Sequence, residues 1–148
     1  MSSLDKRIST KIIQTLEDGQ KGFAEAAEKV DGTDYPDLLA KFNSYSAQRA
    51  TFSTELETLA AAYGDDIDES GSVLAAAHRS WMTVKDMLAG SSPEGVIEAA
   101  LQGESYTISQ YQEALEEDIS RGLREVLVRQ MAEIQKVDRE LASVPVPA

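Results

Sequence analysis

Hydrophobic residues recur at intervals of three and four along most of this chain, the spacing typical of amphipathic α-helices. No stretch alternates between apolar and polar residues as a half-buried strand would. The pattern predicts four long helices, over residues 4–30, 36–63, 95–117 and 118–143, and a shorter one over residues 73–88. Four long helices in one domain predict an all-α fold, a four-helix bundle.

The short predicted helix lies in the connection between the second and third long helices. This connection, about residues 64–94, is long enough to cross back over the bundle. A crossover of this kind allows the second and third long helices to run parallel. We therefore expect one domain over residues 1–143. The tail, residues 144–148, contains two prolines and is expected to be a flexible end.

A polar residue interrupts the apolar face near the middle of each long helix. These residues are Gln20, Arg49, Glu104 and Gln130. An unpaired charge inside a bundle costs several kcal/mol, so we expect Arg49 and Glu104 to pair, with the glutamines satisfying the remaining hydrogen bonds. One interpretation is a buried polar layer that fixes the register of the helices. The other is a metal site.

Two glycines, Gly19 and Gly22, lie inside the first predicted helix, where glycine is unfavourable. They indicate either a close approach between two helices or room for a ligand or a bulky polar side chain.

The metal interpretation can be compared with the ligands of di-iron bundles. Such a site takes a glutamate from each of two helices and a Glu-x-x-His motif from each of the other two. Glu17, Glu104 and Glu133 are the candidate ligands here, but Lys136 stands where Glu133 would need a histidine, and the cation of Arg49 would repel a metal. We therefore expect no cofactor, with iron or manganese as the alternative.

Two further residues have side chains that could serve a site. His78 is the only histidine, and it shares a face of the short helix with Trp81. It is either a hydrogen-bonded core residue or a ligand or proton shuttle. Gln48 precedes Arg49 and is the second. The acidic loop 64–72 lacks the spacing of a calcium-binding EF-hand, so we interpret it as a solvated linker.

Composition narrows the possible partners. The 148 residues include 26 acidic and 14 basic side chains, for a net charge of −12, which argues against nucleic acid and anionic membranes. The absence of cysteine excludes disulfides and thiol chemistry. There is neither an apolar run of about 20 residues nor a signal sequence, so we expect a cytoplasmic protein.

Several segments resemble one known family. They are residues 16–28, 48–56, 71–82, 103–104 and 129–130. The most specific are DGQKGF at 18–23 and HRSW at 78–81. Together they resemble a bacterial ferritin-like four-helix-bundle family known only as a domain of unknown function. The resemblance implies a ferritin-like bundle with the crossover between helices two and three, and it implies no activity.

The chain also departs from that family's pattern. The family often has a glutamate where this chain has Gln48, and a histidine near Val137 or Asp138. Both departures weaken metal binding. Our first hypothesis is therefore a non-catalytic bundle that acts by self-association or through a partner, in general stress physiology. The alternatives are a metal-binding or redox protein of ferritin descent, and an enzyme that uses Arg49 and Glu104 on a small anion.

Overall fold

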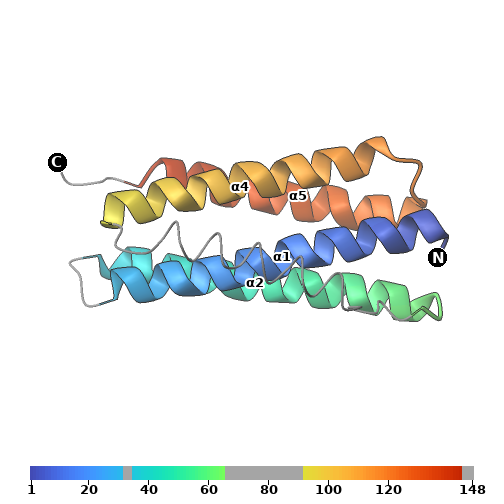
Figure 1. Ribbon diagram of the computed structural model, residues 1–148, viewed down its shortest axis with the longest axis horizontal. Coiled ribbons are helices and arrows are strands. Elements are labelled where there is room, and N and C mark those ends of the chain that lie inside the picture. The colour runs from blue at the N-terminus through green and yellow to red at the C-terminus, as the bar shows by residue number, and fades with distance from the viewer. Residues whose placement is uncertain (32–34, 66–91, 145–148) are drawn as a thin grey trace.

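The computed structural model describes residues 1–31, 35–65 and 92–144, which form an all-helical bundle (Figure 1). The described residues include no strand. The predicted helix over residues 73–88 lies outside the described part of the chain. The helices are α1 (Ser3–Val30), α2 (Pro36–Ala62), α4 (Pro93–Glu116) and α5 (Arg121–Ala142). The predicted all-α four-helix fold is confirmed.

The bundle consists of two antiparallel hairpins, α1 with α2 and α4 with α5 (Figure 1). Helices α2 and α4 begin at the same end of the bundle and run in the same direction, as the long connection between them allows. Helix α1 packs closely on both α2 and α4, whereas the backbones of α2 and α5 approach each other at few places. Helices α2 and α4 are therefore diagonal partners across the core.

Local sequence signals account for most helix ends. The Ser2 hydroxyl accepts the N–H of Asp5 at 3.0 Å and caps α1. The Ser92 hydroxyl accepts the N–H of Gly95 at 3.2 Å and caps α4. Prolines occupy the first turn of α2 and of α4, where no intrahelical N–H bond is lost. Gly64, with φ of 80°, follows the end of α2 in the left-handed region that glycine favours.

The start of the last helix differs from the prediction. Residues 118–120 are not helical, and α5 begins at Arg121 rather than near Asp118. The backbone is extended at Glu117, whose carbonyl accepts the N–H of Ile119 at 2.9 Å. The N–H of Ser120 then donates to Asp5 Oδ1 on α1 at 3.0 Å. This bond from a distant helix could not be read from local sequence.

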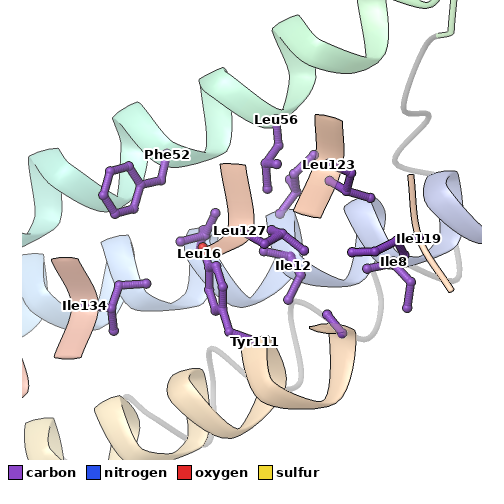
Figure 2. Packing of buried hydrophobic residues seen from close by; sticks show 12 residues of the cluster. Ile8, Ile12, Leu16, Phe52, Leu56, Tyr111, Ile119, Leu123, Leu127 and Ile134 are labelled. Carbon is purple, nitrogen blue, oxygen red and sulfur yellow. The ribbon is translucent and has the colours of Figure 1, made fainter. Parts of the chain in front are cut away.

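The interior contains two apolar clusters, one toward each end of the bundle. The first includes Leu16, Leu56, Tyr111 and Leu127 (Figure 2). The second, built around Phe23, Phe42, Val96 and Leu141, fills the other end. The opposite faces of the helices carry polar and charged residues. None of the described helices is both long enough and apolar enough to span a membrane.

Candidate functional site

A buried ion pair joins α2 to α4 between the two apolar clusters. Arg49 Nη1 donates to Glu104 Oε1 at 2.7 Å, and Arg49 Nη2 donates to Glu104 Oε2 at 2.6 Å. Arg49 is 0% exposed and Glu104 is 1% exposed. The two parallel bonds form the bidentate geometry in which a guanidinium binds a carboxylate most specifically. The structure therefore brings together the two charged residues that the sequence analysis paired.

The rest of the guanidinium is enclosed by α1 and by a neighbour on α2. The Arg49 Cζ atom lies 5.1 Å from the centroid of the Phe23 ring, a cation–π distance. Arg49 Nε donates to Gln48 Oε1 at 3.2 Å. A Cβ atom at Gly19 would lie 3.4 Å from Arg49 Nη1, at the limit of ordinary contact, so the arginine packs directly against this glycine. The structure shows both predicted features, a close approach of α1 to α2 and a bulky polar side chain beside the glycine.

Burial and pairing act on Glu104 in opposite directions. Loss of hydration raises the pKa of the Glu104 carboxyl, while the hydrogen bonds and charge of Arg49 favour its ionised form. The charge of Asp138 on α5 adds to the upward shift of this pKa. Among the ion pairs of the described residues, this is the only one with both side chains buried. Its stability therefore depends on complete hydrogen bonding rather than on solvent.

The fourth predicted member of the polar layer, Gln130, lies at a different height. Tyr45 Oη donates to Glu140 at 2.9 Å, and Arg129 bonds to Glu55, which together fix the register of α2 against α5. That register places Arg49 level with residue 136. Gln130 is six residues from this level, roughly 9 Å along the helix. The predicted single layer is therefore wrong for Gln130, because equal heights were taken from helix midpoints and the helices are staggered.

Gln130 instead organises a second polar group within the first apolar cluster. Its Oε1 accepts the Tyr111 hydroxyl at 2.7 Å, and its Nε2 donates to the Phe52 carbonyl at 3.2 Å and to Glu55 Oε1 at 2.8 Å. Glu55 also accepts a bond from Arg129, which is half exposed. Burial raises the pKa of Tyr111 far above its ordinary value. This group connects a buried phenol to the surface through one amide and one carboxylate.

Gln20 does not contribute its side chain to the pair either. Its side chain is partly exposed, and its backbone carbonyl accepts the Ser46 hydroxyl at 2.8 Å. Position 20 lies between the two apolar clusters, but Gly19 is the residue of α1 that contacts the guanidinium. Successive residues of a helix point about 100° apart, so Gln20 points away from the guanidinium that Gly19 contacts.

The three candidate metal ligands do not assemble. Both oxygens of Glu104 already accept bonds from Arg49, and Glu133 is exposed on α5. Glu17 is partly exposed on α1. Within the described ranges no three His, Cys, Asp or Glu side chains are grouped so that they could hold a metal ion. A guanidinium bonded to the central carboxylate is also the wrong neighbour for a cation, so the described residues do not fit a metal centre.

The remaining candidate residues differ in whether the structure describes them and in how exposed they are. His78 and most of the acidic loop 64–72 lie outside the described residues. Gln48 is partly buried and bonds to Arg49, as described above. Tyr106, an aromatic residue two positions after Glu104, is 58% exposed on α4. The buried arc of α4 includes Glu104, which places position 106 on the far side of the helix.

Several residues of these polar groups were not predicted. Phe23 and Tyr111 could not be assigned to these groups from the sequence, because an aromatic ring at helical spacing carries no sign of its polar partner. Glu55 and Glu140 stand on solvated faces in the sequence, and nothing local shows that they bridge α2 to α5. Chemically, the two polar groups are hydrogen-bonded networks, of which the Arg49–Glu104 group is buried and the Gln130 group reaches the surface at Arg129. They include no paired nucleophile and base with access to solvent.

Comparison with known proteins places the chain in a family. No curated protein matches it. A family described as "Domain of unknown function (DUF2383)" matches residues 10–117. This match covers more than half of the 148 residues, including most of α1 and all of α2 and α4, and therefore both members of the buried ion pair. The chain belongs to the DUF2383 family of domains of unknown function.

Proposed function

We propose that this protein is a non-catalytic, ferritin-like helical bundle in which the buried ion pair has a structural role. The observation that carries the proposal is that both carboxylate oxygens of Glu104 are already hydrogen-bonded. Each of its oxygens accepts a short bond from Arg49, and 1% of the residue is exposed. A carboxylate in this state can neither ligate a metal nor act as a general base unless the pair first separates.

The ferritin-like assignment is supported by the course of the chain. Helices α2 and α4 run parallel, and they are joined by the longest connection between any of the described helices (Figure 1). They are also the two helices that supply charged groups to the middle of the core. Bundles with one long crossover and functional residues on facing helices have this arrangement.

We further propose that the protein acts from its surface, by self-association or by binding a partner protein in the cytoplasm. Support comes from the lack of an accessible reactive group in the described networks. The net charge of −12 disfavours nucleic acid and anionic lipid as that partner. If the protein self-associates, sedimentation equilibrium should show a defined oligomer. If it binds a partner protein instead, the purified chain should be a monomer and should sediment as a larger complex after a lysate fraction is added.

The test of the structural role measures metal binding and stability together. Protein purified without a tag, from cells grown with added iron and manganese, is expected to contain less than about 0.1 metal ion per chain by elemental analysis. Adding Fe²⁺, Mn²⁺ or inorganic phosphate should leave the melting temperature unchanged, because a ligand that binds only the folded state raises it. Stoichiometric metal that disappears in the Glu104→Ala variant would refute the proposal and support a degenerate metal site of ferritin descent.

A further inference from the structure

One side of the bundle is built differently from the others. Helices α1 and α2, α1 and α4, and α4 and α5 pack with their backbones close together, but α2 and α5 approach at few places. The core between α2 and α5 contains apolar side chains of both helices, such as Leu56 and Leu127, and polar side chains bond across the edge. We call this edge the α2–α5 seam and define it by the contacts Tyr45–Glu140 and Glu55–Arg129.

Three contacts lie along the seam in one register. Tyr45 Oη donates to Glu140 near one end, and Arg129 donates to Glu55 nearer the other. Beyond that pair, Tyr63 lies over the start of α5, where a Cβ on Gly122 would be 2.9 Å from its hydroxyl oxygen. Tyr63 is 51% exposed. Tyr45 is buried, whereas Tyr63 and the Glu55–Arg129 pair are partly exposed, and exposed ion pairs contribute little to stability.

We propose that the bundle opens along the α2–α5 seam, with the two hairpins separating as units about the α1–α4 contact, and that the Arg49–Glu104 pair is the latch. Local opening favours the part of a structure with low contact density, and among the neighbouring helices α2 and α5 have the fewest close backbone approaches. Opening here leaves each hairpin intact. It breaks the contacts of the seam, the bonds from Gln130 to α2, and the diagonal pair between α2 and α4.

The inference goes beyond the proposed structural role, because it states how the buried polar groups become accessible. In the closed bundle Gln130 and Arg49 are both 0% exposed. Separation of α2 from α5 uncovers Gln130 first, since its donor bonds to α2 lie directly behind the Glu55–Arg129 pair. The open state presents the inner apolar faces of the two hairpins, which is a conformation that a partner could select.

Two buried positions distinguish opening at the seam from opening elsewhere. Val137, 4% exposed, lies two turns after Gln130 and therefore on the face of α5 that meets α2. Ser53, 5% exposed, lies two turns after Ser46, whose hydroxyl bonds to α1, so it faces α1 from α2. The chain has no cysteine, so Val137→Cys and Ser53→Cys each give a single thiol probe. Both substitutions are close to the original residue in size.

The experiment measures the rate at which a thiol reagent labels each variant under native conditions. We expect labelling of Val137→Cys to be at least about tenfold faster than that of Ser53→Cys, after correction for global stability, because the seam opens without global unfolding. Equal rates at the global unfolding limit would overturn the proposal. Faster labelling of Ser53→Cys would also overturn it, because the bundle would then open between α1 and α2.

A surface substitution tests the seam without touching the core. Arg129→Gln removes the ion pair across the seam, and Arg121→Gln removes an exposed pair within α5 as the matched control. We expect Arg129→Gln to raise the labelling rate of Val137→Cys about threefold or more and to leave Ser53→Cys unchanged. Arg121→Gln should change neither rate. An identical response to Arg129→Gln and Arg121→Gln would refute the assignment of the opening edge.

Discussion

The strength of the buried ion pair can be measured with a double-mutant cycle. Arg49→Leu leaves Glu104 in the core without a partner, and the residue is only 1% exposed. Breaking a buried pair by removing one member costs about 3–5 kcal/mol, since the other charge stays desolvated. Glu104→Leu should cost a similar amount by stranding the guanidinium. The double variant Arg49→Leu/Glu104→Leu should recover most of the loss, because no uncompensated charge remains.

Context changes the magnitude of the two single losses. Arg49 also contacts the Phe23 ring and bonds to Gln48, and the cation–π contact is worth about 1 kcal/mol. We therefore expect Glu104→Leu to be the more damaging substitution, because the stranded guanidinium has more donors than its remaining neighbours can satisfy. The double variant loses the cation–π contact as well, so its recovery should stop about 1 kcal/mol short of the parent.

The assay is urea unfolding followed by circular dichroism at 222 nm, with the free energy extrapolated to water. The exposed pair Arg121–Glu125 within α5 is the control cycle, and its coupling should not exceed about 0.5 kcal/mol. Single losses of about 3–5 kcal/mol each and a double variant about 1 kcal/mol below the parent give an expected coupling energy between positions 49 and 104 of about 5–9 kcal/mol. Additive losses with no coupling would mean that the two side chains are not partners in solution and would refute our account of the core.

Three further predictions concern single positions. Gly103→Ala should stabilise the bundle by about 0.5–1 kcal/mol in urea unfolding, because a Cβ there meets nothing within 4 Å and glycine is costly inside α4. Arg124→Met should destabilise it by about 1–3 kcal/mol, since Arg124 caps α4 through two backbone carbonyls at its end, each at 2.8 Å. Burial raises the pKa of Tyr45 and Tyr111, so the stability that these phenols contribute below pH 10 should be lost as the pH rises above 10. In Tyr45→Phe and in Tyr111→Phe, the tyrosinate absorbance at 295 nm that appears on unfolding should decrease by one tyrosine.

The helices and their order could be predicted from sequence because the signal is local. Apolar spacing identified four long segments, and prolines, glycines and serine caps placed most ends within two residues of the observed ones. The buried pair could also be predicted, because a charge at an apolar position requires an opposite charge. Arg49 and Glu104 were the only residues of opposite charge at such positions near the helix midpoints.

The height and rotation of each helix could not be predicted, because they depend on contacts between distant segments. The bond from Ser120 to Asp5 shifts the start of α5, and the stagger of α5 removes Gln130 from the level of Arg49. A rotation of one residue on α1 brings Gly19 rather than Gln20 to the guanidinium. Each shift is small, yet it decides which side chain reaches the polar group. Residues 66–91, with His78, lie outside this comparison.

A diagonal ion pair constrains the bundle more than a pair between neighbouring helices would. Arg49 and Glu104 meet across the centre, so a one-residue slip of either α2 or α4 turns its charge by about 100° toward an interface. The two bonds of 2.7 and 2.6 Å would then be lost while the charges remained buried. Apolar side chains tolerate such slips far better, because hydrophobic burial has no direction. The same geometry makes the pair a latch between the hairpins, since no separation of α2 from α4 can preserve it. The register of α2 against α4 and the association of the two hairpins therefore depend on the same two bonds. Replacing both residues of the pair with leucine should weaken the register and allow the hairpins to separate more often.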